Sequence, residues 1–134
     1  MTKKIIEILI LIFIAASCER IADETDPAKL ILGKWEIIEI GNWPIMEAVE
    51  DPGGYIKFLR DSILIEYASD THDTMQKKYW INILLYECFY LQQEHRCVIT
   101  GRYEYEFFDK NKKLRLDLSN IASNYTTFIY KRIK

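Results

Sequence analysis

Residues 96–118 read RCVITGRYEYEFFDKNKKLRLDL, and this stretch decides the fold. Apolar and polar side chains largely alternate from Cys97 to Phe107, and the alternation returns from Leu114 to Leu118. A period of two is typical of a half-buried β-strand. If residues 109–112 form a loop, three apolar pairs share one face: Phe107 with Leu114, Tyr105 with Leu116 and Tyr103 with Leu118. A one-residue slip would reverse the facing of a whole strand, so we predict an antiparallel hairpin in this register.

The remaining segments are rich in β-branched and aromatic residues, which favour strands. We predict seven strands in all, at Gly33–Ile40, Tyr55–Arg60, Ser62–Ala68, Lys77–Leu91, Arg96–Phe107, Leu114–Leu118 and Tyr125–Arg132. A short helical turn is expected at Pro44–Glu50. Asp51-Pro-Gly-Gly54 predicts a tight turn, because Pro presets φ and Gly accepts positive φ. Strands that follow one another through short turns predict an all-β antiparallel meander.

Two cysteines lie on the hairpin predicted after Lys77–Leu91. If residues 91–94 form its loop, several apolar pairs face each other: Cys88 with Cys97, Tyr90 with His95, Tyr86 with Ile99 and Trp80 with Tyr105. Opposed Cα atoms in an antiparallel pair lie ~4.5–5.5 Å apart, a separation that disulfides accept. We predict a Cys88–Cys97 disulfide, with two buried free thiols as the alternative. A catalytic pair of Cys97 and His95 is disfavoured because no third orienting residue is evident.

The composition limits the classes of protein to consider. A chain of 134 residues has room for one domain. With 49% hydrophobic and 13% aromatic residues it is too apolar to be disordered. The formal net charge of −2 lacks the basic excess of a nucleic-acid-binding protein, so we expect no nucleic-acid partner.

The beginning of the chain predicts a secretory signal. Lys3 and Lys4 precede the apolar run Ile5–Ala16, which is too short to span a bilayer, and small residues then lead to Cys18. This arrangement resembles the lipobox of bacterial lipoproteins, although Ala15 stands where that motif usually has Leu. The resemblance implies that Cys18 becomes the mature N-terminus and carries the lipid anchor, palmitate included. The alternative is an ordinary secreted protein with a chance cysteine.

The lipobox divides the chain into three parts. We expect a signal peptide at 1–17, a lipid-anchored flexible tether at 18–29 and a β-barrel domain at 30–134. Glu19 is not the Asp that favours inner-membrane retention in enterobacterial lipoproteins. We therefore expect an outer-membrane lipoprotein of the cell envelope, with the periplasmic and the surface face both open.

Five short motifs carry a resemblance over about residues 30–134. They are Gly33-Lys-Trp35, Tyr55-Ile-Lys-Phe58, Tyr103-Glu-Tyr-Glu-Phe107, Lys113-Leu-Arg-Leu116 and Tyr130-Lys-Arg132. In this order they resemble the lipocalin-like domain lipoproteins of Bacteroidetes-type bacteria. The resemblance implies an up-and-down barrel of about eight strands in which Trp35 closes one end and Arg132 packs on it. The chain departs in showing seven predicted strands, unless Gly41–Met46 or the long Lys77–Leu91 segment supplies another, and in having no C-terminal helix, which leaves a closed or a partly open barrel.

Four aromatic residues are candidates for a ligand wall: Trp35, Trp80, Tyr86 and Tyr105. An interior of about eight strands is only wide enough for packed side chains or one small ligand, so the same residues could instead fill the core. We expect a binding protein for a small apolar or aromatic ligand, with Gly41–Asp51 as a lid loop. The alternative is a protein with a filled barrel that docks to a partner in an envelope complex.

No pattern in the sequence predicts catalysis, and we expect no enzyme activity and no cofactor. Phosphate-binding Gly loops and nucleophile elbows are missing from the sequence. Asp70, His72 and Asp73 share one loop, but their spacing matches no established metal site, and none is predicted. The carboxylates on strands are expected on the solvated outer face: Glu36, Glu39, Glu66, Glu104 and Glu106.

Overall fold

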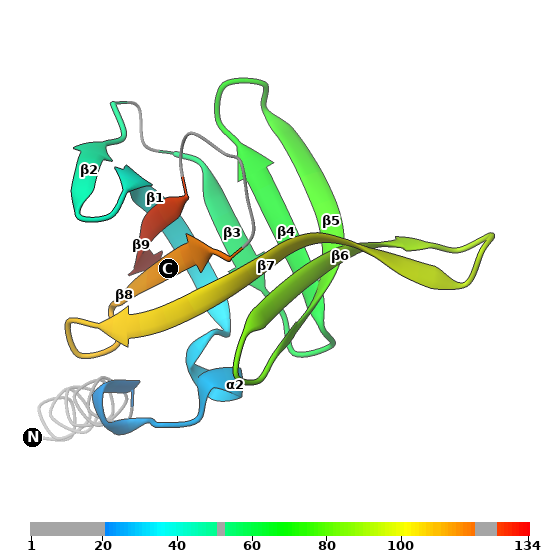
Figure 1. Cartoon of the computed structure of the whole chain (residues 1–134), viewed down its shortest axis with the longest axis horizontal. Helices are drawn as coiled ribbons and strands as arrows, with labels where there is room; N and C mark the ends of the chain where they lie inside the picture. Colours follow the sequence, from blue (N-terminus) through cyan, green and yellow to red (C-terminus); the bar gives the residue numbers. More distant parts are fainter. Residues whose placement is uncertain (1–20, 51–52, 120–125) are drawn as a thin grey trace, which may run out of the picture.

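The computed structural model describes residues 21–50, 53–119 and 126–134 (Figure 1). Residues 21–23 are helical, and a short helix, α2 (Pro27–Leu30), comes between them and the strands. The strands are β1 (Gly33–Asn42), β2 (Ile45–Ala48), β3 (Tyr55–Phe58), β4 (Ile63–Ala68), β5 (Asp73–Ile81), β6 (Leu85–Leu91), β7 (Arg96–Phe108), β8 (Lys113–Leu118) and β9 (Thr127–Ile133). The predicted signal peptide and Cys18 lie outside the described residues. Within those ranges no helix has the length and apolar character needed to cross a membrane.

Eight of these strands close into an antiparallel barrel. From β3 to β9 each strand pairs with its neighbour in sequence, and β1 pairs with both β3 and β9. The remaining strand, β2, pairs with the end of β1 and lies outside the ring. The prediction of an all-β, up-and-down antiparallel barrel is therefore confirmed. The barrel is closed, and its architecture is consistent with a lipocalin-like barrel.

The single strand predicted at Lys77–Leu91 is wrong. This segment forms two strands, β5 and β6, which pair as a hairpin with Trp80 opposite Tyr86. Asn82 makes the turn, because its backbone N–H donates to the Leu84 carbonyl at 3.0 Å and its side chain accepts from the Leu84 N–H at 3.2 Å. A short polar side chain that bonds its own backbone in this way replaces the Gly or Pro of a more visible turn. The extra strand supplies the eighth member of the barrel.

The helical turn expected at Pro44–Glu50 is also wrong, because residues 45–48 form β2. β1 is ten residues long but pairs with β3 only from Gly33 to Glu36. Its far half therefore has unpaired backbone groups on that side, and β2 pairs with them from Glu39 to Asn42. Satisfying these groups favours a strand over a helical turn. The lid loop expected at Gly41–Asp51 is thus largely a hairpin attached to β1.

The hairpin that decides the fold has the predicted register. Between β7 and β8, Phe107 lies opposite Leu114, and the two further predicted pairs are present: Tyr105 with Leu116 and Tyr103 with Leu118. Leu114 and Leu116 are buried in the core of the barrel. The alternation from Tyr103 to Leu118 therefore predicted both the pairing and the facing of the residues that form this hairpin.

The register predicted between β6 and β7 is wrong by two residues. Tyr90 lies opposite Cys97 and Cys88 opposite Ile99, so the predicted oppositions of Cys88 with Cys97, Tyr86 with Ile99 and Trp80 with Tyr105 do not occur. The position of the loop is the reason: it spans residues 92–95 and not 91–94, so Leu91 lies opposite Arg96. A β-bulge then shifts the pairing by one more residue, because it passes from Cys88–Ile99 to Glu87–Gly101 and Thr100 is the extra residue. A bulge adds one residue to one strand and so reverses its facing. Ile99 is 56% exposed, whereas Gly101 is buried against the interior.

Cys88 and Cys97 are joined by a disulfide across this hairpin, with their Cα atoms 5.6 Å apart. The two residues are diagonal neighbours, since each lies opposite another residue of the partner strand. A diagonal pair remains close enough here because the bulge bends and twists the ladder locally. The disulfide joins β6 and β7, which form the hairpin that extends beyond the barrel in Figure 1.

Candidate ligand-binding site

The barrel has one end that side chains close. Arg132 lies over the Trp35 ring at 4.2 Å, and the Trp35 indole N–H donates to the Ile31 carbonyl at 2.8 Å. Two further Arg132 hydrogen bonds reach the carbonyls of Leu32 at 2.9 Å and Leu30 at 2.8 Å. Trp35 and Ile31 are fully buried. The guanidinium therefore ties the last strand to the segment that enters β1, and we call this the closed end.

Gly33 makes the approach to this closed end possible. Its φ of +114° lies in a region of backbone conformation that residues other than glycine rarely adopt. The Gly-x-Trp motif thus has a physical basis in this chain: glycine permits the turn that brings Trp35 under Arg132.

The segment before β1 covers the closed end. Asp26 caps α2, since its side chain accepts from the Ala28 N–H at 3.0 Å and Pro27 begins the helix. The Asn111 side-chain amide, in the β7–β8 turn, donates to three backbone carbonyls of this segment, those of Ile21, Ala22 and Glu24. The last residues of the range predicted as a tether, 27–29, therefore belong to a helix that packs at the barrel.

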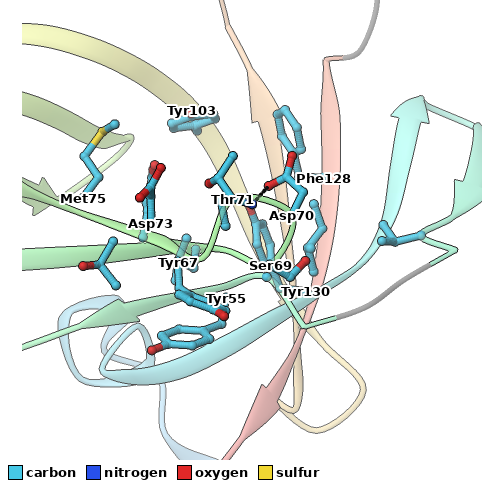
Figure 2. Close-up of a pocket in the computed structure, with 17 residues that line it drawn as sticks. Tyr55, Tyr67, Ser69, Asp70, Thr71, Asp73, Met75, Tyr103, Phe128 and Tyr130 are labelled. Atoms are coloured by element: carbon cyan, nitrogen blue, oxygen red, sulfur yellow. Dashed lines mark hydrogen bonds between the residues drawn. The ribbon is translucent and has the colours of Figure 1, made fainter.

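The opposite end of the barrel, which we call the mouth, holds a cavity of about 550 Å³. The turn between β4 and β5 forms part of its rim, and Figure 2 shows the side chains that surround it. Most of the described lining residues are apolar or aromatic, among them Ile37, Val49, Ile56, Met75, Tyr103, Phe128 and Tyr130. Cavities of this size and character commonly bind small molecules.

A buried group of charged side chains lies beside the cavity. The Lys77 ammonium is 3.2 Å from Oε1 of Glu66 and 3.6 Å from Oε1 of Glu87. The Tyr103 hydroxyl donates to the same Glu87 oxygen at 2.8 Å. Gly101 leaves the space for this arrangement, because a Cβ there would lie 2.5 Å from the Tyr103 ring and 2.6 Å from Glu87 Oε1. We call Glu66, Lys77, Glu87 and Tyr103 the interior polar cluster.

Burial changes the ionisation of this cluster. Desolvation raises the pKa of the Glu87 carboxyl, and repulsion by Glu66 raises it further, while Lys77 and the Tyr103 hydrogen bond act in the opposite direction. Burial and then the Glu87 charge raise the pKa of Tyr103 above its ordinary range. Burial also raises the pKa of Tyr130. Both phenols therefore stay neutral, and burial makes the Glu87 carboxyl hold its proton more strongly than it does in the unfolded chain.

We expect Glu87→Gln to remove part of the pH dependence of stability. The folded protein keeps a proton on Glu87 at pH values at which the unfolded chain has lost it, because the pKa is raised on folding. The free energy of unfolding therefore falls as the pH rises through this window, by at most about 1.4 kcal/mol per pH unit for one proton. Urea unfolding over a pH series should show a smaller decline for Glu87→Gln than for the unsubstituted protein.

Glu104→Gln is the matched control, because Glu104 is exposed on the same hairpin. This variant should keep the full decline. An equal decline in Glu87→Gln and in the unsubstituted protein would show that Glu87 titrates alike in the folded and unfolded states.

None of the four predicted ligand-wall residues is among the described residues that line the cavity. Trp35 is buried at the closed end. Trp80 stacks on Tyr86 with ring centroids 4.9 Å apart, and both lie on the outer face because their neighbours Tyr79 and Glu87 point inward. The Tyr105 hydroxyl donates to the Asn82 carbonyl.

The sequence analysis missed most of the residues at the mouth. Tyr103 does lie on the face predicted to be apolar, but Glu66 was expected on the outer face and lies inside instead. The alternation could have indicated this, because Glu66 lies two residues after Leu64 on the same strand and therefore faces the same side, and Leu64 is 1% exposed. Lys77 and Glu87 gave no such signal, since a charged residue on a strand usually faces solvent.

The loop of Asp70, His72 and Asp73 does not gather these side chains into a metal site. His72 Nδ1 is hydrogen-bonded to the Tyr67 hydroxyl at 3.0 Å, and Asp70 accepts from the Thr71 N–H at 2.9 Å. No group of three or more potential metal ligands occurs in the part of the chain that the structure describes.

No protein-family model matches the chain, and no curated protein matches its sequence.

Proposed function

We propose that this protein binds a small, largely apolar or aromatic molecule at the mouth of its barrel. The observation that carries the proposal is the cavity of about 550 Å³, which is lined mainly by apolar and aromatic side chains. Binding sites for small molecules commonly occupy about 300–1,000 Å³ and combine apolar walls with a few polar groups. The interior polar cluster supplies such groups at one side of the cavity.

The alternative function is docking in an envelope complex through a barrel with a filled interior. The cavity argues against a filled interior, so it favours the ligand-binding function. Native mass spectrometry of the protein purified from its own envelope distinguishes the two. We expect a stoichiometric small molecule, whereas a co-purifying protein without any small molecule would support the alternative.

A fluorescence titration with N-phenyl-1-naphthylamine, a neutral aromatic probe, tests the cavity directly. Ala68→Trp places a large side chain at the rim, because Ala68 lines the cavity and shares the inward parity of Glu66. We expect this variant to bind the probe at least about tenfold more weakly, a change of about 1.4 kcal/mol. Ala48→Trp is the matched control, since Ala48 is an exposed alanine on β2. Equal probe binding by both variants would contradict a site at the mouth.

We further propose that the chain is a lipid-anchored protein of the outer membrane, a member of the lipocalin-like lipoproteins that its motifs resemble. Stable anchoring requires more than one acyl chain, as a fully lipidated Cys18 would provide. Cys18→Ala should move the protein from the membrane fraction to the soluble fraction of a lysed cell. Retention of an uncleaved Cys18→Ala protein in membranes would contradict the lipobox interpretation.

A further inference from the structure

The cavity at the mouth has a one-sided charge. Three described lining residues are acidic, Glu66, Asp70 and Asp73, and no described lining residue is a lysine, arginine or histidine. Figure 2 shows Asp70 and Asp73 on either side of Thr71 at the rim. Clefts lined by one sign of charge raise the local concentration of the opposite sign. The electrostatics of the cavity therefore favour a cation over an anion.

The lysine of the interior polar cluster does not reverse this preference. The Lys77 side chain is only 10% exposed, and its ammonium already contacts the carboxylates of Glu66 and Glu87. A ligand carboxylate placed on Lys77 would meet both of these carboxyl groups at close range. Like charges in such a site repel strongly, so this cluster is a poor receptor for a fatty acid.

Within the interior polar cluster, the Glu66 carboxylate is the charged group that a ligand in the cavity can contact. Its side chain is 32% exposed and lines the cavity, in contrast to those of Lys77 and Glu87 at 10% and 9%. One oxygen accepts from Lys77, which leaves lone pairs for a further donor. The cluster and the rim together hold four carboxyl groups against one ammonium. Even without the Glu87 carboxyl, three carboxyl groups face one ammonium.

Aromatic groups stand beside this carboxylate. Tyr103 and Phe128 meet edge to face with ring centroids 6.5 Å apart, and Tyr130 lines the same wall. The Tyr130 hydroxyl makes no hydrogen bond to another described residue, so it is available to a ligand. Ring faces attract cations, and a phenol oxygen accepts from an ammonium. An ammonium group is thus matched by charge, by hydrogen bonding and by its aromatic surroundings.

We propose that the ligand is an amphipathic amine whose cationic head group binds the Glu66 carboxylate while its apolar part fills the mouth of the barrel. This inference rests on the proposed function, since it names the class of ligand for the same cavity. An ammonium has three donors, which Glu66 and the Tyr130 hydroxyl can accept in part. The apolar walls then cover the hydrocarbon or aromatic part of the ligand.

Three probes of equal chain length test the head group: decylamine, decanol and decanoate, each used to displace N-phenyl-1-naphthylamine. We expect decylamine to bind at least about tenfold more tightly than the other two, as one charge-assisted hydrogen bond can supply. Glu66→Gln should abolish this preference and leave decanol binding unchanged. Glu104→Gln makes the same charge change on the outside of the barrel and should keep the preference.

The outcomes separate this inference from the proposed function. Decanoate binding as tightly as decylamine, or a preference that survives Glu66→Gln, would overturn the amine inference while a site in the cavity stands. If neither the fluorescent probe nor any decyl compound binds, the proposed function itself fails. Should Glu66→Gln not fold, Asp73→Asn at the rim replaces it, with a smaller but same-direction loss for decylamine and none for decanol.

Discussion

Replacement of Trp35 by alanine is expected to lower the free energy of unfolding by about 3–5 kcal/mol, the usual cost of emptying a fully buried aromatic site. Trp35 has no exposed surface, its ring centroid lies 6.0 Å from that of Phe107, and its indole N–H donates to the Ile31 carbonyl. The variant loses all of these contacts and leaves Arg132 without the ring beneath it. Urea unfolding followed by far-UV circular dichroism measures the change.

Trp80→Ala provides the matched control for this prediction. Trp80 is 39% exposed and stacks on Tyr86 on the outer face. Loss of an exposed aromatic pair costs about 0.5–1.5 kcal/mol, well below the value expected for Trp35. Equal destabilisation by the two variants would contradict the placement of Trp35 as the centre of the closed end.

The second large effect is expected for Arg132→Met, which keeps an apolar stem and removes the guanidinium. Three carbonyls lose a donor, those of Leu30, Leu32 and Asn111. At about 1 kcal/mol for each hydrogen bond, we expect a loss of about 2–4 kcal/mol. Partial burial lowers the pKa of Arg132, yet a guanidinium remains charged at neutral pH, so the loss should not depend on pH between 6 and 8.

The neighbouring residue supplies the control for Arg132. Lys131 is half-exposed, and its ammonium lies 3.8 Å from the Glu36 carboxylate in a loose pair at the surface. Lys131→Met removes one positive charge from the same strand and should change the free energy of unfolding by less than about 1 kcal/mol. A similar loss for both variants would mean that net charge, and not the hydrogen bonds to the closed end, sets the stability.

The sequence predicted those parts of the fold in which alternation is unbroken. The β7–β8 hairpin is the best example, because Tyr103 and Leu118 pair as the pattern requires. The neighbouring hairpin was misread because its loop lies one residue later than predicted, with Leu91 opposite Arg96, and because Thr100 forms a bulge that changes the facing beyond it. The β5–β6 turn was missed because Asn82 makes it without a Gly or Pro.

The candidate site was harder to predict than the barrel. Its aromatic wall includes Tyr103, which the alternation does place on the inner face. The sequence did not predict an inward position for Glu66, Lys77 and Glu87. Burial of any one of these charges alone is unfavourable, and it becomes tolerable only because Lys77 contacts both carboxyl groups. These contacts join residues of β4, β5 and β6, so they cannot be predicted from the residue pattern within any one strand.

The closed end determines how a lipid anchor on Cys18 would orient the barrel relative to a membrane. Residues 21–24 are held there by Asn111, and Cys18 is only three positions before Ile21, a reach of at most about 11 Å in an extended chain. A lipid on Cys18 would therefore hold the Trp35 end toward the bilayer and turn the opening of the barrel away from it. In that orientation a ligand would enter the cavity from the aqueous side, and a molecule dissolved in the supporting membrane would have no direct path into it.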